Sequence, residues 1–470
     1  MTSGNHSTDI AVLGGGPGGY VAAIVAAQRG ASVALVEKDR LGGTCLNVGC
    51  IPTKALLTSA ALLLHARHAT DFGLNIPSAE PDLAGLMAYK RRTVDQLVGG
   101  VEQLLKGRKV TILRGEGKLI KPDRIAVRTA NAETSEISAS RIILAPGSIT
   151  SVPPIEGQNL PGVMTSTEAL DISSVPAHLV IIGGGVIGLE FACIYEALGS
   201  KVTVLELTPG ILPGTTDEAI SKRLLLLLHR RGMDIQTNTA VRKIERVGDK
   251  LRVVSQINGV EALTDCDRVL VATGRWPNTV GMGFTEAGLR MNGRAIQVDT
   301  YLRSSLPNVY AVGDAIGGWM LAHKAMVDGR VAAENATGGQ RQVDYRSVPS
   351  VIFTRPEVAS VGLTETEARA TGVEVKIVQS PFSANPRART LGEPDGLVKL
   401  ICEAGTGRVL GVHMLGPHVT DLIAEGALAV QTGATADDLA WTTHAHPTLP
   451  EAMLEAALGF RGGAIHFHVR

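Results

Sequence analysis

Two segments of this sequence repeat one layout, and no other feature restricts the possible folds as strongly. DIAVLGGGPGG begins at Asp9 and LVIIGGGVIG begins at Leu179, and each is predicted to be a short strand that runs into G-x-G-x-x-G. Each continues through a helical stretch into a second apolar strand that ends in an acid, Glu37 or Glu206, 18 positions after the third glycine. One glycine run is weak evidence, but the complete unit, present twice, indicates two dinucleotide-binding folds.

The glycines and acids of these units suit a dinucleotide for physical reasons. Residues without a Cβ atom allow a tight turn in which backbone N–H groups approach a pyrophosphate, and the N-terminus of the next helix attracts that anion. The acid accepts hydrogen bonds from ribose hydroxyls. The glycines concerned are Gly14, Gly16 and Gly19 in the first unit and Gly183, Gly185 and Gly188 in the second.

The acid of the second unit also indicates which nicotinamide cofactor is bound. Glu206 would repel the 2′-phosphate of NADP, and the segment LTPGILPG after it contains no Arg or Lys to neutralise one. NAD is therefore predicted. The alternative is that Glu206 is only a solvated strand end.

Charge and hydropathy narrow the class of protein further. Lys and Arg number 45, as do Asp and Glu, so no excess charge points to a nucleic-acid or membrane surface as the main partner. No apolar run approaches the roughly 20 residues of a membrane span, and the N-terminus MTSGNHSTDI lacks the layout of a signal peptide. We therefore expect a soluble, cytoplasmic protein with no nucleic-acid or membrane partner.

The predicted elements divide the chain into four domains. The Pro- and Gly-rich segment Ser151–Gly157 is predicted to cross between domains, and the region from about Val348 has no glycine fingerprint. We predict one dinucleotide-binding domain over 1–150, a second over 151–278, a central domain over 279–347 and a C-terminal domain over 348–470. The patterns also predict helices over Leu57–Ala69, Leu86–Leu105, Val419–Thr432 and Leu449–Leu458. They predict strands over Arg141–Ser148, Arg268–Asn278 and Leu306–Ala315.

Two cysteines, Cys45 and Cys50, lie in GGTCLNVGCIPTKAL, between glycines and the start of a predicted helix. They could be zinc ligands, a structural staple or a redox pair. Zinc needs about four ligands, usually in two short-spaced pairs, whereas the other cysteines, Cys193, Cys266 and Cys402, are scattered singly. A permanent disulfide would constrain so small a loop little, and a reducing compartment opposes it. No metal site is predicted.

Helix geometry favours the redox pair. Five helical steps rise about 7.5 Å, whereas Cα atoms joined by a disulfide usually lie about 4.4–6.8 Å apart. The cysteines can therefore pair only if the start of the helix is distorted, and Gly49 gives the backbone that freedom. A bond formed under such constraint is comparatively reducible. Beside two dinucleotide folds, we interpret the pair as a redox-active disulfide that exchanges electrons with a flavin.

With these motifs in view, the chain resembles the pyridine nucleotide–disulfide oxidoreductases, and within them it is most similar to the dihydrolipoamide dehydrogenases. The resemblance implies an α/β fold with an FAD-binding domain (1–150) and an NAD-binding domain (151–278), both Rossmann-like. It also implies a central domain (279–347) that completes the FAD site and a C-terminal α+β dimerisation domain (348–470). The motifs that carry the resemblance are GGGPGGYVAA, GGTCLNVGCIPTKALL, GGGVIGLE, ATGRWPN, NVYAVGDA, LAHKA, PFSANPRAR and HAHPTLPEA.

The resemblance further implies how the cofactors are held. Glu37 would bind the adenosine ribose of FAD, and Asp314 its ribityl chain. Lys54, paired with Glu190, would lie near the reactive edge of the flavin and tune its potential. Further cofactor contacts are implied at Thr44, Gly147, Gly274, Ala322 and His323.

The same resemblance assigns the catalytic groups. Cys45 would exchange with the substrate and Cys50 would lie against the flavin, while His446 would act as the base and Glu451 would accept its other N–H. In this family the histidine reaches the disulfide of the other subunit, which implies a homodimer with shared active sites. The implied reaction oxidises dihydrolipoamide to lipoamide and reduces NAD⁺ to NADH. Lipoyl-bearing and core acyltransferase subunits of a 2-oxo acid dehydrogenase complex, or glycine cleavage, are the implied partners.

Three positions depart from the family pattern. The departures are Pro146 in APGS, Pro450 in HPTLPE, and KAMVDG (Lys324–Gly329), which lacks the acids common after HKA.

A glutathione or mercuric reductase is disfavoured because cations after the second fingerprint and a C-terminal cysteine pair are missing from the sequence. A non-catalytic flavoprotein is disfavoured because both cysteines and the His–Glu pair are kept.

Overall fold

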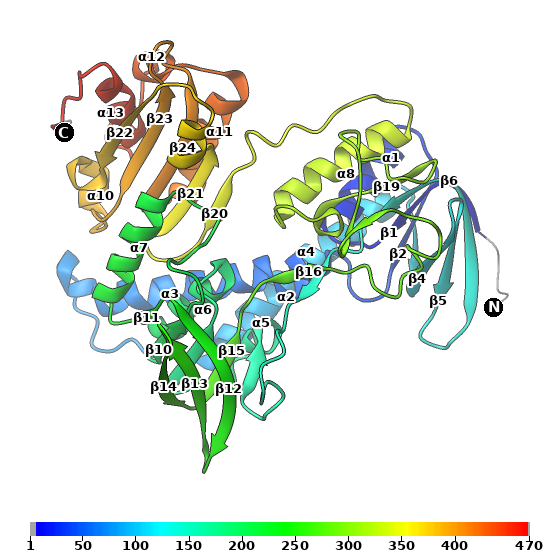
Figure 1. Cartoon of the computed structure of the whole chain (residues 1–470), viewed down its shortest axis with the longest axis horizontal. Helices are drawn as coiled ribbons and strands as arrows, with labels where there is room; N and C mark the ends of the chain where they lie inside the picture. Colours follow the sequence, from blue (N-terminus) through cyan, green and yellow to red (C-terminus); the bar gives the residue numbers. More distant parts are fainter. Residues whose placement is uncertain (1–5, 469–470) are drawn as a thin grey trace.

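The first dinucleotide unit forms the core of a mixed sheet, seen on the right in Figure 1. The computed structural model describes residues 6–468, so the first half of the N-terminal segment considered above lies outside the described residues. The strands β3, β2, β1, β6 and β19 lie side by side in that order and run parallel, with α1 packed against α8. These elements are β1 (His6–Leu13), α1 (Pro17–Gln28), β2 (Val33–Glu37), β3 (Thr111–Arg114), β6 (Thr134–Leu144), β19 (Val309–Ala311) and α8 (Ala322–Ala336).

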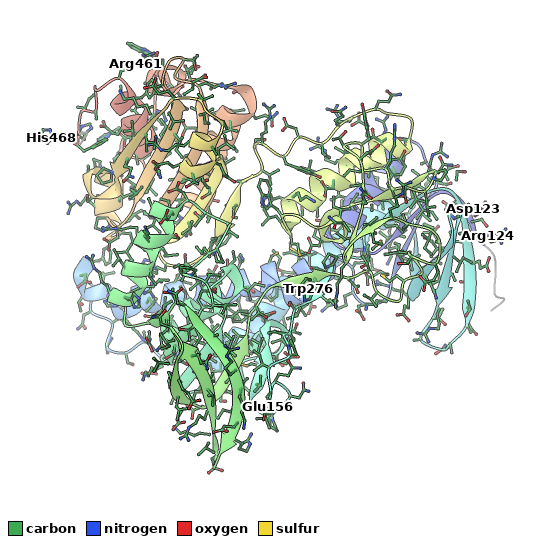
Figure 2. All side chains as sticks on the ribbon, viewed as in Figure 1. Asp123, Arg124, Glu156, Trp276, Arg461 and His468 are labelled. Atoms are coloured by element: carbon green, nitrogen blue, oxygen red, sulfur yellow. The ribbon has the colours of Figure 1, made fainter. Side chains whose placement is uncertain are left out.

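The fifth parallel strand of this sheet comes from far along the chain. Val309 of β19 pairs with Ile142 of β6, so the segment after β19 arrives at the same edge of the sheet as the first glycine turn. The other half of β6 belongs to an antiparallel meander with β4 (Glu116–Lys121) and β5 (Arg124–Arg128). Asp123 and Arg124 lie at the tip of this meander, at the outer edge of the molecule (Figure 2).

The second unit repeats this architecture with a parallel sheet in the order β11-β10-β9-β15-β8. Its fifth strand, β8, is local and directly precedes the unit. A three-stranded antiparallel meander, β12-β13-β14, again follows. The elements are β8 (Val163–Thr165), α5 (Ser166–Ala169), β9 (His178–Ile182), α6 (Val186–Leu198), β10 (Lys201–Leu205), α7 (Glu218–Arg230), β11 (Asp234–Gln236), β12 (Thr239–Val247), β13 (Lys250–Ile257), β14 (Val260–Cys266) and β15 (Arg268–Val271).

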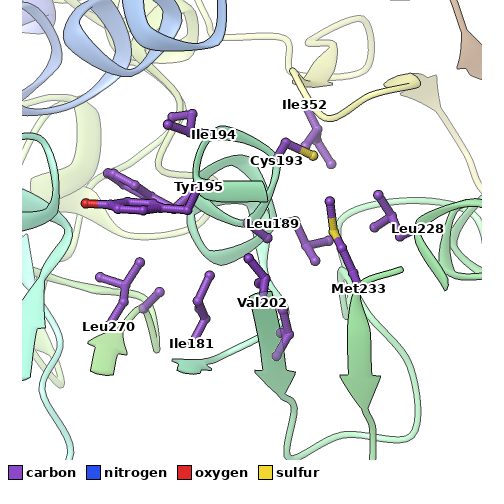
Figure 3. Close-up of a cluster of buried hydrophobic side chains, with 14 of the residues drawn as sticks. Ile181, Leu189, Cys193, Ile194, Tyr195, Val202, Leu228, Met233, Leu270 and Ile352 are labelled. Carbon is purple, nitrogen blue, oxygen red and sulfur yellow. The ribbon is translucent and has the colours of Figure 1, made fainter. Parts of the chain in front are cut away.

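A long helical segment joins the two units. α2 (Gly43–Val48), α3 (Cys50–Arg67) and α4 (Leu83–Gly107) lie in the chain between β2 and β3 of the first unit, and α3 packs against both α4 and α6. The apolar core beneath α6 includes Leu189 of α6, Ile181 of β9 and Ile352 from the C-terminal part of the chain (Figure 3). By length and composition alone, Gly43–Arg67 is apolar enough to cross a membrane. In the structure it is broken at Gly49 and packs against other helices.

The C-terminal part is an antiparallel sheet, β20-β21-β24-β23-β22, with helices against it. Two Rossmann-like units and one α+β unit thus confirm the predicted fold class. The strand expected over Arg268–Asn278 is interrupted at Gly274, whose φ of +105° turns the chain so that β16 pairs with β7. The remaining elements are β7 (Ser148–Thr150), β16 (Arg275–Pro277), β17 (Met291–Asn292), β18 (Ala295–Ile296), β20 (Ser350–Ile352), β21 (Glu357–Gly362), α9 (Glu365–Ala370), β22 (Val375–Pro381), α10 (Pro386–Thr390), β23 (Leu397–Glu403), β24 (Val409–Gly416), α11 (Val419–Thr432), α12 (Ala436–Trp441) and α13 (Glu451–Phe460), with short 3₁₀ turns η1 (Ala69–Phe72), η2 (Gly313–Ile316) and η3 (Phe382–Ala384).

Candidate active site

The outer glycines of both fingerprints are required by close backbone packing. Gly14 and Gly183 have φ of +104° and +111°, a region that L side chains rarely adopt. A Cβ atom at Gly19 or Gly188 would lie 1.8 Å or 2.0 Å from the carbonyl oxygen of the first glycine of its own unit. These four positions therefore hold the turn and the helix against the sheet.

The middle glycines have a different role, because they face open space. A Cβ atom at Gly185 would meet no atom within 4 Å, and one at Gly16 would meet its nearest neighbour at 3.9 Å. Each is the N-cap of its helix, α1 or α6, and neither helix has a side-chain cap. The start of each helix is thus left free for an anion, and the residues present fit the pyrophosphate of a dinucleotide.

The two strand-end acids make the same contacts in both units. Glu37 accepts hydrogen bonds from the N–H groups of Gly15 (2.8 Å) and Asp39 (2.8 Å). Glu206 accepts them from Gly184 (2.6 Å) and from the residue two positions after itself (2.7 Å). Each carboxylate is therefore fixed beside its glycine turn.

Asp314 follows the end of β19 and therefore lies at the carboxyl edge of the first sheet. The Ser148 hydroxyl donates to Asp314 Oδ2 at 2.5 Å, and Arg275 Nε donates to Ser148 Oγ at 2.7 Å. Arg275 Nη2 also reaches Thr44 Oγ1 at 3.3 Å, and burial lowers the pKa of this guanidinium. The structure thus joins Asp314 to Thr44 through two residues that the sequence reasoning missed. Both residues lie in motifs that carry the family resemblance, Ser148 in APGS and Arg275 in ATGRWPN.

The turn that precedes Ser148 is well formed although Pro146 departs from the family pattern. Pro146 is followed by Gly147, whose φ is +71°. Asn278 fixes the turn, since its N–H donates to the Gly147 carbonyl at 3.0 Å and its side-chain amide donates to the Pro146 carbonyl at 3.3 Å.

The turn that carries Asp314 rests on a buried ion pair in α8. Asp328 Oδ2 accepts from the Gly313 N–H at 3.0 Å and from Lys324 Nζ at 2.9 Å, while the Tyr345 hydroxyl donates to Oδ1 at 2.7 Å. Burial raises the pKa of Tyr345, which keeps its phenol protonated. KAMVDG therefore keeps one acid that supports the site. The predicted contacts Ala322 and His323 begin this helix, and His323 Nε2 lies 2.6 Å from a backbone carbonyl oxygen.

The helix carrying the cysteines is distorted as expected. α2 ends at Val48 and α3 starts at Cys50, because Gly49 between them has φ −140° and ψ −114°. A Cβ atom at Gly49 would lie 2.9 Å from the Thr44 carbonyl oxygen. The break keeps Cys45 and Cys50 close enough for each thiol to shift the pKa of the other, and both are half-buried, free thiols in this structure.

Electrostatics distinguish the two thiols. The hydrogen bond with Cys50, and then burial, raise the pKa of Cys45. The same hydrogen bond lowers the pKa of Cys50 to about 7, with burial opposing and the Lys54 charge assisting. Lys54 Nζ lies 2.9 Å and 2.8 Å from the carboxylate oxygens of Glu190, whose Oε1 also accepts from a backbone N–H in the C-terminal part. Of the two thiols, Cys50 is thus the one that loses its proton more readily.

A histidine–glutamate pair lies at the start of α13. His446 Nδ1 is 2.8 Å from Glu451 Oε1, and Glu451 Oε2 accepts from the Thr448 N–H at 2.7 Å. Burial opposes ionisation of Glu451, but these two contacts outweigh it and lower the pKa of the carboxyl. Pro450 directly precedes the helix, so this departure leaves the pair intact. The His446 side chain is 69% exposed, and its contact with Glu451 is made through Nδ1.

The PFSANPRAR motif supports this loop. Asn385, which is buried, donates from Nδ2 to the Thr448 carbonyl at 3.0 Å and accepts from the Ala388 N–H at 3.0 Å. Thr448 is therefore fixed at both its N–H and its carbonyl. This positioning role of Asn385 was missed because the contact spans 63 residues of sequence.

Within one protomer the predicted catalytic residues form two separate groups. Cys45, Cys50, Lys54 and Glu190 lie together where α2 and α3 pack on α4 and α6. His446 precedes α13, which packs on β22, β23 and α12, and Figure 1 shows α13 in a different part of the fold from α2 and α3. The cysteine group and the His446–Glu451 pair thus belong to different parts of the fold.

Comparison with known proteins agrees with this class of two-dinucleotide disulfide oxidoreductase. The pyridine nucleotide-disulphide oxidoreductase family matches residues 8–329, and its dimerisation domain matches residues 348–457. The chain therefore belongs to the pyridine nucleotide-disulphide oxidoreductases and carries their dimerisation domain.

Within this family, the chain is similar to several individual proteins over nearly its whole length. The chain is 42% identical to the dihydrolipoyl dehydrogenase of Geobacillus stearothermophilus, over 98% of this chain and 97% of the relative. It is also 42% identical to the mitochondrial dihydrolipoyl dehydrogenase of Pisum sativum, over 99% of this chain and 94% of the relative. The crystal structure of LpdA from Mycobacterium tuberculosis superposes with a TM-score of 0.89 at 30% identity, over 96% of this chain and 99% of that one.

Proposed function

We propose that this protein is a dihydrolipoyl dehydrogenase, which oxidises dihydrolipoamide with NAD⁺ and uses FAD as its resident cofactor. The observation that carries the proposal is the free thiol pair at the Gly49 break, beside Lys54–Glu190. Two open glycine turns and relatives of that activity, aligned over nearly the whole chain, support it. In this proposal Gly14, Gly16, Gly19, Glu37 and Asp314 hold FAD, and Gly183, Gly185, Gly188 and Glu206 hold NAD.

The chain's own residues perform the dithiol chemistry. His446 takes the proton of one substrate thiol, and the resulting thiolate attacks Cys45 of the oxidised pair, which breaks the Cys45–Cys50 bond and releases Cys50 as a thiolate. The second substrate thiol then gives up its proton and its sulfur attacks the first, which forms the product disulfide and releases Cys45 as a thiolate that takes up that proton. Glu451 orients His446 and stabilises its cation. Bound FAD supplies the redox chemistry that passes the two electrons from the reduced pair to NAD⁺.

The separation of the two catalytic groups within one protomer supports a shared site. A second copy, held through the dimerisation domain, would present its His446 to the cysteines of the first. The homodimer would then be the catalytic unit. We extend the proposal to lipoyl-bearing and core acyltransferase subunits as partners, and to a cytoplasmic location, where reducing conditions let the pair cycle.

The purified flavoprotein should form NADH from dihydrolipoamide and NAD⁺, with kcat/KM for NAD⁺ well above that for NADP⁺, because Glu206 repels a 2′-phosphate. Absorbance at the NADH band, with each nicotinamide varied at fixed dithiol, measures this. A protein that binds both cofactors yet forms no NADH from any dithiol would contradict the proposal.

Gly185→Ala should leave the fold intact and weaken NAD binding. The added Cβ meets no atom of the chain, yet it enters the space assigned to the pyrophosphate. We expect an unchanged thermal midpoint and a Kd for NADH raised about 100-fold, the scale on which a blocked polar site loses its ligand. Gly405→Ala is the matched control, since its Cβ also meets nothing within 4 Å and Gly405 lies in the C-terminal part of the chain. Equal NADH affinity in the two variants would place the dinucleotide elsewhere.

A further inference from the structure

One loop of the NAD unit is tied to both parts of the site described above. Residues 207–216 connect Glu206 to the start of α7. Near its beginning, the N–H and hydroxyl of Thr208 donate to Glu206 Oε1 at 2.7 Å and 2.8 Å. In its middle, the Leu212 N–H donates to the Gly184 carbonyl at 3.0 Å. The position of this loop therefore fixes both the ribose acid and the glycine turn.

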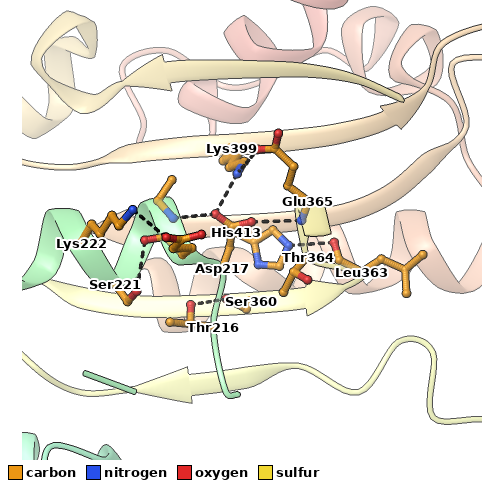
Figure 4. A network of polar contacts seen from close by, with 12 residues as sticks. Thr216, Asp217, Ser221, Lys222, Ser360, Leu363, Thr364, Glu365, Lys399 and His413 are labelled. Atoms are coloured by element: carbon orange, nitrogen blue, oxygen red, sulfur yellow. Dashed lines mark hydrogen bonds and ion pairs between the residues drawn. The ribbon is translucent and has the colours of Figure 1, made fainter. Parts of the chain in front are cut away.

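The far end of this loop is held by the C-terminal sheet (Figure 4). Asp217 is the N-cap of α7, and its Oδ1 accepts from the Ala219 N–H at 3.0 Å. The same oxygen accepts from Lys399 Nζ of β23 at 2.7 Å. Next to it, the hydroxyls of Thr216 and Ser360 of β21 are 2.9 Å apart. Two consecutive residues of the NAD unit are thus bonded to side chains of the dimerisation domain.

The sheet presents these polar groups by its own alternation. Val398 and Leu400 on either side of Lys399 pack into the apolar core of the C-terminal part, so Lys399 points to the opposite face. The adjacent strands place His413 and Ser360 on the same row. The Lys399 side chain is only 2% exposed, and its second partner is Glu365 Oε2 at 2.8 Å. A buried ammonium needs such partners, and Asp217, equally buried, needs Lys399 in return.

We propose that Lys399 is a positioning residue for NAD binding, acting through Asp217 and the loop 207–216. The inference rests on the proposed function only for the identity of the dinucleotide. When Lys399 is removed, Asp217 keeps a buried charge with fewer partners, and the start of α7 shifts toward water. The loop then spends less time in the arrangement that orders Glu206 and Gly184, and the apparent affinity for the dinucleotide falls by the same fraction.

The test compares NADH binding with the dithiol half-reaction in the flavin-loaded dimer. Lys399→Met should raise the Kd for NADH about tenfold, the usual scale of coupling between distinct sites, as measured by calorimetry. The rate of flavin reduction by dihydrolipoamide, in stopped flow without nicotinamide, should stay unchanged. Adding Asp217→Asn should restore part of the affinity, because Asn keeps the helix cap and removes the unpaired charge.

The opposite end of α7 provides a matched control. Arg231 there donates to Glu196 Oε2 at 2.6 Å and to the Arg355 carbonyl at 2.9 Å, so it also joins the NAD unit to the C-terminal part. Arg231→Met should lower the thermal midpoint and leave the NADH Kd unchanged. Lys399→Met with normal NADH affinity, or Arg231→Met with equally weakened affinity, would overturn the proposal. Calorimetric measurement of NADH binding needs no dithiol substrate. It therefore tests the role of Lys399 even if the physiological substrate is not dihydrolipoamide.

Discussion

Cys45→Ser should lower dihydrolipoamide-dependent NADH formation by roughly 10⁶-fold, the scale on which enzymes lose a covalent nucleophile. Serine has nearly the same shape but cannot form the mixed disulfide or regenerate the disulfide of the pair. Steady-state assays of the flavin-loaded dimer measure the loss. Cys402→Ser is the control, because Cys402 is buried in the C-terminal core and makes no contact with the pair. A Cys45→Ser enzyme with substantial turnover would refute the role of the pair.

The two cysteine variants should differ in their spectra. Cys45→Ser keeps Cys50 beside the Lys54 charge, which lowers its pKa, and the serine hydroxyl can still donate to the thiolate, so a long-wavelength thiolate-to-flavin band should persist. Cys50→Ser should lack that band. The thiolate is the deprotonated form, so the band should weaken as the pH falls through about 7 and reach its full height above it. A band that persists in Cys50→Ser would show that Cys50 is not the charged thiol.

His446→Gln should slow the dithiol half-reaction by about 10²–10⁴-fold, the range attributed to a general acid–base group. Glutamine can still bond Glu451, but it cannot take a proton from the substrate thiol. Stopped-flow reduction of the flavin by dihydrolipoamide measures the effect, and the Kd for NADH should stay unchanged. An equal loss in both measurements would indicate a disturbed fold instead of a missing base.

A mixed dimer tests where that histidine acts. One subunit carrying Cys45→Ser and the other carrying His446→Gln should together recover about half of the wild-type activity, because one of the two sites keeps both residues. Each parent homodimer should remain inactive. If the base served the cysteines of its own subunit, the mixed dimer would be as inactive as its parents.

The parts of the site that could be predicted from sequence are those fixed by short-range spacing. The glycine turns and their acids lie within one strand–helix–strand unit, so their residue types and offsets indicated both dinucleotide sites directly. The distortion at Gly49 could be predicted as well, because disulfide geometry and helix rise conflict over a known number of residues.

Contacts between distant segments could not be read from the pattern. Ser148 and Asp314 are 166 positions apart, and Lys399 and Asp217 are 182 apart. Nothing local to either partner marks such a pair, because the shared position exists only after two sheets have packed. The break in the strand at Gly274 was missed for a related reason. The residue types favour extended backbone on both sides, and only pairing of β16 with β7 reveals the turn.

The late arrival of β19 has a consequence for how the chain is made. The strand that closes the first sheet lies at Val309–Ala311, whereas every strand of the second parallel sheet lies between residues 163 and 271. On a ribosome that adds about 5–20 residues each second, the second nucleotide-binding unit emerges whole while the first still lacks an edge. The N-terminal half must therefore wait, with the flank of β6 uncovered, for many seconds after its own residues have left the exit tunnel.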